Sequence, residues 1–206
     1  MCTRFHIFDS MEAYREILEE AQESPLLERF RETGRTMLTS GEVRPTDVVA
    51  VLASSRGGNV KAFPMRWGFR SPGRSLLVNA RVETAAQKPS FRDSWEKHRC
   101  AVPAGWYYEW AHTEEGERRR GEKYRIRPEG EELTWLCGLY RMEEGLPVFA
   151  VLTRAPSAEL FRIHDRMPVM LPEEALDAWL NPKGRPEDIL SAALTETVWE
   201  PALTGA

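Results

Sequence analysis

Residues 99–110 read RCAVPAGWYYEW, and this stretch decides the fold class that the sequence predicts. Branched and aromatic residues favour strands, and Pro103 and Gly105 interrupt the run. Segments of similar composition follow as EKYRIRP (122–128), LTWLCGLYR (133–141) and LPVFAVLTR (146–154). Together they predict a mainly antiparallel sheet in the middle and second half of the chain.

Helices are predicted before and after these strands along the chain. Residues 10–20 (SMEAYREILEE) carry apolar side chains at helical spacing, and Asp9 or Ser10 can cap this helix. A second helix is predicted from Pro25 through Phe30, ending before Gly34. Shorter helical segments are predicted within residues 90–98, 157–164, 172–180 and 187–194.

Further strands complete the prediction. They are expected within residues 46–54, 58–69, 74–80 and 167–171. Residues 115–122 (EGERRRGE) predict a charged loop, and the last residues look loosely held. We therefore expect an α+β protein with one domain over residues 1–206.

Composition narrows the class of protein. The 206 residues are 42% hydrophobic and 29% charged, as in an ordinary soluble globular protein. No apolar run is long enough for a transmembrane helix, and no signal-peptide pattern follows Met1. Three scattered cysteines (Cys2, Cys100 and Cys137) form no disulfide framework, and no CxxC or HExxH pattern indicates a metal. We expect a cytoplasmic protein with a free Cys2 thiol, no metal and no cofactor.

The net charge of −4 is unevenly distributed along the chain. Residues 9–33 hold eight acidic and three basic residues, a net of −5. Residues 61–99 hold nine basic and three acidic residues, a net of +6. A basic middle segment can face phosphates, and the same count also fits an arginine-rich surface in water.

Four stretches place polar groups at the ends of predicted strands. They are Cys2 with Arg4; Asn79, Arg81 and Glu83 in VNARVETA; Glu109 in WYYEW; and His164 with Arg166 in IHDRMPV. Because side chains alternate along an extended segment, Asn79, Arg81 and Glu83 are predicted to lie on one face of it. A carboxyl group between aromatic residues is suited to proton transfer if it is desolvated.

Taken one at a time, each of these residues has an ordinary structural interpretation. Glu109 fits a strand residue that points into water, and local sequence slightly favours that interpretation. His164 fits a structural histidine, and Asn79 fits a turn or an edge position. The two arginines, Arg81 and Arg166, fit surface ion pairs. Cys100 and Cys137 lie in apolar strands and are expected to be core residues.

The order of motifs along the whole chain favours one family. MC-x-RF, WGF, NAR-x-ETA, KPSFRDS, RCAVPAGWYYEW and LTR-x-PS before IHDRMPVML occur in succession. This series resembles the SRAP family of SOS-response-associated peptidases and DNA abasic-site processing proteins. Thr3 stands where the family usually has glycine, and Trp106 stands where it often has glycine. The resemblance implies a barrel-like sheet with flanking helices, the SRAP fold.

The resemblance also implies that Cys2, exposed by removal of Met1, forms a covalent link to an abasic site in single-stranded DNA. The chemistry of the residue supports this expectation. An α-amine has a pKa of about 7.8, against about 10.4 for lysine, so it holds far more free base at neutral pH. It can attack the sugar aldehyde, and the adjacent thiol can close on the imine carbon as a thiazolidine ring. The expected activity is therefore lyase-type Schiff-base chemistry in the DNA damage response.

Roles for the other residues follow from the same resemblance. Glu109 is similar to the acid/base, His164 to a proton donor for sugar ring opening, and Asn79 to the residue that positions the sugar or cysteine. Arg4, Arg81 and Arg166 resemble phosphate clamps, and Trp67 and Trp110 resemble platforms for flanking bases. The expected partner is single-stranded DNA with abasic sites, bound by a monomer that is nucleoid-associated when on DNA.

Two other functions fit the same residues. A thiol peptidase would use Cys2 with Glu109 and His164, in its simplest form as a hydrolase that removes its own Met1. A non-covalent binder of single-stranded DNA would leave Cys2 without a chemical role.

Overall fold

The computed structural model describes residues 2–8, 12–73, 75–112 and 121–202. The strands are β1 (Phe5–Ile7), β2 (Gly41–Val43), β3 (Val48–Ser54), β4 (Val60–Trp67), β5 (Phe69–Arg70), β6 (Leu76–Leu77), β7 (Asn79–Arg81), β8 (Arg99–Ala104), β9 (Trp106–Trp110), β10 (Lys123–Pro128), β11 (Thr134–Glu143), β12 (Leu146–Arg154), β13 (Met167–Pro168), β14 (Met170–Leu171) and β15 (Thr197–Pro201).

The α-helices are α1 (Glu12–Glu23), α2 (Pro25–Glu32), α3 (Val82–Ala85), α4 (Arg92–Lys97), α5 (Leu176–Leu180) and α6 (Pro186–Ile189). Three short 3₁₀ helices are η1 (Leu160–Arg162), η2 (Glu173–Ala175) and η3 (Leu190–Ala192). Across the part of the chain that the structure describes, none of the helices has both the length and the apolar character needed to cross a membrane.

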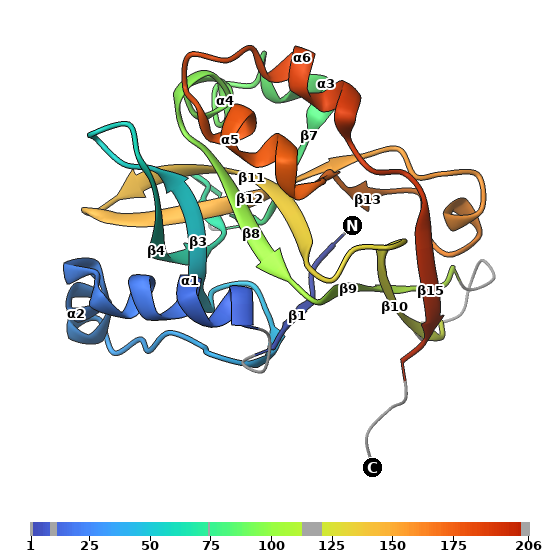
Figure 1. The fold of residues 1–206 in the computed structure, drawn as a ribbon, viewed down its shortest axis with the longest axis horizontal. Helices are drawn as coiled ribbons and strands as arrows, with labels where there is room; N and C mark the ends of the chain where they lie inside the picture. The colour runs from blue at the N-terminus through green and yellow to red at the C-terminus, as the bar shows by residue number, and fades with distance from the viewer. Residues whose placement is uncertain (1, 9–11, 74, 113–120, 203–206) are drawn as a thin grey trace.

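Five strands close into a barrel. The pairings run β3–β4, β4–β12, β12–β11, β11–β8 and β8–β3, and of these only β4–β12 is parallel. A second sheet has the strand order β15-β10-β9-β1-β2, and Figure 1 shows it beside the barrel, with β9, β10 and β15 at one side of the molecule. The prediction of an α+β fold with a mainly antiparallel, barrel-like sheet and flanking helices is confirmed.

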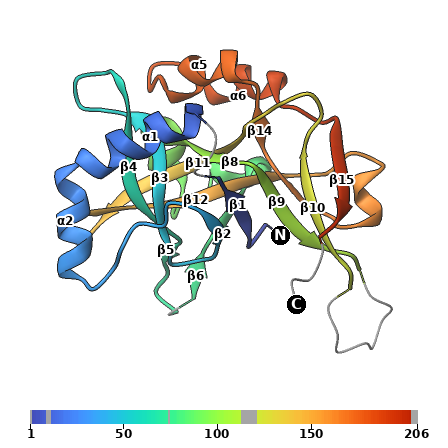
Figure 2. The ribbon, with the colours of Figure 1, turned by 60° about the horizontal axis from the view of Figure 1, so that its bottom comes forward.

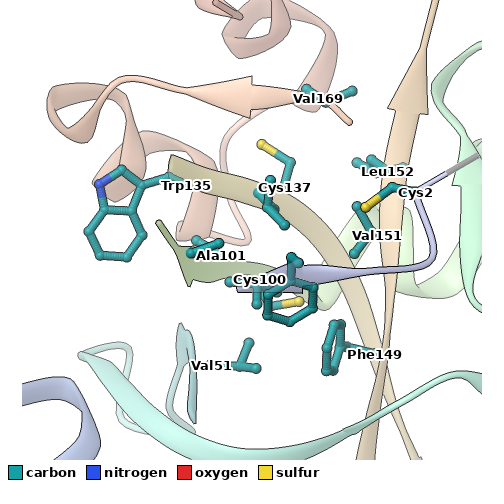
Figure 3. Close-up of a cluster of buried hydrophobic side chains, with 14 of the residues drawn as sticks. Cys2, Val51, Cys100, Ala101, Trp135, Cys137, Phe149, Val151, Leu152 and Val169 are labelled. Carbon is teal, nitrogen blue, oxygen red and sulfur yellow. The ribbon is translucent and has the colours of Figure 1, made fainter. Parts of the chain in front are cut away.

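The barrel interior explains why its strands read as apolar runs. Every residue of β8 is buried, as are most residues of β3, because each strand is covered on both faces. Figure 3 shows Cys100 and Cys137 among the aliphatic and aromatic side chains of this core. Both cysteines are fully buried, so their prediction as core residues is confirmed.

The first two helices also match the sequence pattern. Helix α1 buries Tyr14, Leu18 and Ala21 and packs against β3 and β4. Helix α2 begins at Pro25, and the Ser24 hydroxyl accepts a hydrogen bond from Leu26 N at 3.4 Å. The predicted caps Asp9 and Ser10, and residues 115–120 of the predicted charged loop, lie outside the described residues.

Two sequence predictions are wrong. The sequence predicts loosely held residues after residue 194, but residues 197–201 form β15, which pairs with β10 over its whole length. Residues 203–206 lie outside the described residues. The sequence also predicts an extended segment over residues 79–85, but the chain turns into helix α3 after Arg81. In both cases the decisive partner is distant in sequence, so local composition does not reveal the pairing.

Arg99 joins the barrel to the helices above it. This buried side chain donates hydrogen bonds to the carbonyl oxygens of Trp95, Glu96, Trp179, Asn181 and Gly184. The accepting groups lie at or just beyond the ends of α4 and α5, where carbonyls lack partners within the helix. One guanidinium therefore ties both helix ends to the start of β8.

Replacement of Arg99 by lysine should lower the free energy of unfolding by about 3 kcal/mol. An ammonium group cannot satisfy five carbonyls that are arranged around a planar fork. Urea unfolding measures the loss, and Arg92→Lys on the exposed side of α4 is the matched control, expected to change stability by less than about 0.5 kcal/mol. Equal effects of the two substitutions would contradict the role of Arg99.

Candidate functional site

The amino-terminal end of the chain enters the core instead of lying on the surface. Cys2 is 0% exposed, and its carbonyl oxygen accepts a hydrogen bond of 2.7 Å from Asn79 Nδ2. Asn79 pairs with Val151 of the barrel strand β12, and Figure 3 shows Cys2 beside Val151 and Leu152. The sequence-predicted residues Cys2 and Asn79 are therefore in direct contact.

Strand β9 brings Glu109 to the same place. Tyr107 pairs with Phe5, and Tyr108 N donates to Arg4 O at 2.9 Å, so β9 runs alongside the start of the chain. Glu109 is 3% exposed, and burial raises its pKa to about 7. The interpretation of Glu109 as a residue pointing into water is wrong. A carboxyl group with this pKa can accept and return a proton at neutral pH.

His164 is the third titratable side chain at the site, with Cys2 and Glu109. Its Nε2 lies 3.7 Å from Glu109 Oε2, and its ring stacks on His112 with the centroids 5.3 Å apart. Nδ1 lies 3.1 Å from Arg166 N, which can donate to a neutral ring, and 2.8 Å from Asp165 Oδ1, which can accept from a protonated ring. Burial lowers the pKa of His164. These neighbours support both protonation states that a proton relay needs.

The Cys2 thiol is held in its protonated form. Burial, with a further contribution from the negative charge of Glu109, raises its pKa far above the ordinary range. Cys2 Sγ also lies 3.6 Å from the carbonyl oxygen of Arg4, to which a thiol can donate. A preformed thiolate of the kind that nucleophilic cysteine enzymes use is therefore disfavoured.

The three predicted phosphate clamps lie in different settings. Arg4 Nε is 3.2 Å from Glu42 Oε1, and Arg81 is exposed at the end of β7. Arg166 binds both carboxylate oxygens of Glu83, at 2.8 and 2.9 Å, and donates to Thr153 O at 2.7 Å. Arg166 therefore joins α3 to β12, which leaves Arg4 and Arg81 as the more available cations.

The two predicted base platforms differ sharply. Trp67 is 0% exposed, its Nε1 donates to Val78 O at 2.9 Å, and its ring stacks on Phe149. No face of Trp67 is open to a base, so the expectation that it contacts DNA is corrected: it is a core residue at the end of β4. Trp110 is half-buried at the end of β9, and its role at a base stays a prediction.

Several residues beside the site were not predicted. Tyr107 is fully buried on the same face of β9 as Glu109, and the charges of Cys2 and Glu109 add to burial in raising its pKa. Within the described ranges its hydroxyl has no hydrogen-bond partner. Thr153, which binds Arg166, and Asp165, which lies beside His164, belong to quoted motifs and could have been singled out there. No group of three metal-binding side chains occurs among the described residues.

Comparisons with known proteins point to one family. The family model for SOS response associated peptidase (SRAP) matches residues 1–204. Abasic site processing protein YoqW of Bacillus subtilis (strain 168) is 31% identical over 205 residues, which cover 94% of this chain and 86% of that protein. Abasic site processing protein YedK of Escherichia coli (strain K12) is 30% identical over 186 residues, which cover 87% of this chain and 79% of that protein.

Solved structures extend the likeness to the fold. A phage-related protein from Bordetella bronchiseptica aligns with a TM-score of 0.75 at 24% identity, over 98% of this chain and 95% of that one. A protein from Bacteroides thetaiotaomicron aligns with a TM-score of 0.73 at 22% identity, over 98% of this chain and 93% of that one. At these identities the likeness concerns the arrangement of strands and helices alone.

The buried carboxyl group predicts an unusual pH dependence of stability. The pKa of Glu109 is about 7 in the folded chain and about 4.5 in the unfolded chain. Between these values the folded state binds more protons, so the free energy of unfolding falls as pH rises. Relative to Glu109→Gln, the wild type should lose about 3 kcal/mol between pH 5 and pH 8, as measured by urea unfolding. A difference that stays constant with pH would contradict the raised pKa.

The two tryptophans provide a matched pair for a second prediction. Trp67→Phe should lower the free energy of unfolding by about 2 kcal/mol, because it removes a buried hydrogen bond and leaves a gap against Phe149. Its affinity for single-stranded DNA should not change. Trp110→Phe should change stability less and weaken that affinity. Fluorescence anisotropy and urea unfolding separate the two, and the opposite pattern would restore Trp67 as a base platform.

Proposed function

The chain belongs to the SOS response associated peptidase (SRAP) family, and on that premise we propose that it processes abasic sites in DNA. Relatives that align over most of the chain carry the name abasic site processing protein. In finer detail, we propose that Cys2, after removal of Met1, links covalently to the ring-opened sugar of an abasic site in single-stranded DNA. The link shields the lesion during the damage (SOS) response.

One observation carries this proposal: the Cys2 backbone is fixed by Asn79 in a buried site whose carboxyl group has a pKa of about 7. The α-amine of Cys2 adds to the aldehyde carbon and gives a carbinolamine, which loses water to form an imine. The thiol then adds to the imine carbon, and its proton passes to nitrogen. One C–N bond and one C–S bond form, one water leaves, and the sequence needs no oxidant or reductant.

The neighbouring residues supply the protons for these steps. Glu109, whose pKa is raised to about 7 by burial, gives a proton to the departing hydroxyl and takes one from the amine. His164, whose Nε2 lies 3.7 Å from Glu109, exchanges protons with it and donates to the sugar oxygen as the ring opens. A protonated thiol suits the last step, because it brings its own proton to the nitrogen.

DNA contacts surround this chemistry. Arg4, which is partly buried, and Arg81, which is exposed, bind phosphates of the strand. Trp110 stacks on a base next to the lesion. Arg166 acts chiefly as a positioning residue, because Glu83 and Thr153 already hold its guanidinium.

The thiol peptidase alternative has weaker support. Its nucleophile would be a thiolate, but burial raises the pKa of the Cys2 thiol, and the His164 imidazole faces Glu109 and Asp165. Any hydrolytic activity is better confined to a single event at Met1, as maturation of the amino-thiol. Non-covalent binding of single strands remains the other alternative, and the experiment below separates all three.

The decisive experiment uses single-stranded DNA with one abasic site and a denaturing gel. Mature wild type should give a band that survives denaturation, and Cys2→Ala should give none, because both ring-closing groups must be present. Cys2→Ser keeps the amine but closes a less stable ring, so its adduct should decay faster. Cys137→Ala, a second buried cysteine, is the matched control and should give the wild-type band.

The amino terminus is the second control. Protein with an acetylated Cys2 or a retained Met1, verified by mass spectrometry, should form no adduct. Adduct formation by either form would overturn the proposed chemistry. If mature wild type forms no adduct but binds the strand, the non-covalent alternative is correct.

A further inference from the structure

The outer face of the second sheet carries a row of rings beside a row of cations. We call it the β9–β10 face, and it comprises Trp106, Tyr108 and Trp110 on β9 with Lys123, Arg125 and Arg127 on β10. Alternate residues of a strand point to one side, and the register pairs Lys123 with Trp110 and Arg125 with Tyr108. The other side of the same strands holds buried residues such as Tyr107 and Ile126.

The rings hold the cations in place. Lys123 Nζ lies 3.7 Å from the centroid of the Tyr108 ring and 5.5 Å from that of Trp110. Arg125 Cζ lies 4.9 Å from the centroid of Trp106. Each contact falls within the range of cation–π attraction. The charged groups are therefore ordered at the surface before any ligand arrives.

The positive charge on this face is only partly balanced. Glu42 is shared by Arg4, Arg44 and Lys123, and Glu200 pairs with Arg125. Arg127 is exposed and donates to a backbone carbonyl, that of Glu131. With Arg4 and Arg44 beside the face counted in, five cations among the described residues are set against these two carboxylates, a local excess of three positive charges in a protein whose net charge is −4. Such a local excess attracts a polyanion.

Spacing favours a single strand of nucleic acid over other polyanions. Cations at every second residue of β10 recur on the order of 7 Å apart, similar to the phosphate repeat of an extended strand. Rings interleaved with cations are the general pattern of surfaces that bind single strands through stacking and charge. Trp106 already stacks on His6 with ring centroids 4.7 Å apart, and Tyr108 is buried beneath Lys123, so these two rings order the cations and do not themselves stack on bases.

The face is continuous with the candidate site. Trp110 follows Glu109 on β9 and so points to the opposite side of the sheet. The link to the site therefore runs through Arg4, two residues from Cys2, which meets Lys123 through their shared Glu42. Arg125 and Arg127 then lead away along β10. A strand held at Cys2 by its damaged nucleotide therefore has a charged path over the sheet.

We propose that the β9–β10 face binds the undamaged single-stranded segment that leaves the candidate site, through Arg125 and Arg127. This inference rests on the proposed function, because it assigns the path of the same DNA strand. The face thereby lengthens the bound stretch beyond the nucleotides that touch Arg4, Arg81 and Trp110.

The test compares strand lengths in a double variant, Arg125→Gln with Arg127→Gln. Affinity for an undamaged strand of about 20 nucleotides should fall about 5- to 10-fold, whereas affinity for about 6 nucleotides should hardly change. The slope of log affinity against log salt for the long strand should decrease by about 1.4, or about 0.7 for each lost phosphate contact. Fluorescence anisotropy measures both quantities.

The matched control is Arg15→Gln with Arg31→Gln, on exposed positions of α1 and α2. Figures 1 and 2 both place these helices on the opposite side of the molecule from β10. This control removes the same charge and should leave both strand lengths unaffected. If affinity for the long strand falls equally in the two double variants, or falls in neither, the inference is overturned. The cation–π contacts of the face would then serve only the stability of the sheet.

Adduct formation on a short abasic strand separates this inference from the proposed function. If wild type forms no adduct on that strand, the proposed function fails whatever the length dependence. If wild type and the double variant form it equally and bind long strands equally, only the inference fails. If the double variant unfolds, the single variant Arg127→Gln is tested instead, because this residue is exposed. The substitution should lower the slope of log affinity against log salt by about 0.7. An unchanged slope would overturn the inference.

Discussion

The hydrogen bond from Asn79 Nδ2 to the Cys2 carbonyl holds in place a part of the chain that ordinarily frays. Asn79 is itself fixed by the parallel pairing of β7 with β12. The position of Cys2, the first described residue, is therefore set by the barrel. Antiparallel pairing of β1 with β9 adds a second restraint from the other sheet. The site therefore lies where the two sheets meet at the beginning of the chain, and neither sheet alone would position it.

Burial then sets the electrostatics of that junction. It raises the pKa of Glu109 to about 7, raises the pKa of the Cys2 thiol and lowers the pKa of His164. All three shifts favour uncharged side chains, as expected in a poorly solvated site. Such an environment disfavours chemistry that starts from a thiolate. It therefore supports the proposed amine chemistry over the thiol peptidase alternative.

Sequence reasoning predicted the elements whose partners are close in the chain. The helices around residues 12–32 and the strands β3, β4, β11 and β12 follow from spacing and composition. It failed where a distant segment decides the outcome. Glu109 fitted a residue that points into water, but it lies on the buried face of β9 together with Tyr107. Trp67 resembled a base platform, but it is buried against Phe149 at the end of β4. The family resemblance identified the site residues, whereas only three-dimensional packing revealed which of them are accessible.

The burial of Cys2 has a consequence for the biogenesis of the protein. Its neighbours come from residues 79, 107–109 and 151–152, so the pocket around it can close only after most of the chain has left the ribosome. Until then the first residues are an accessible, flexible tail. On the proposed function, removal of Met1 is therefore expected before the barrel forms, while the first residues are still accessible. Fast folding would then compete with complete maturation.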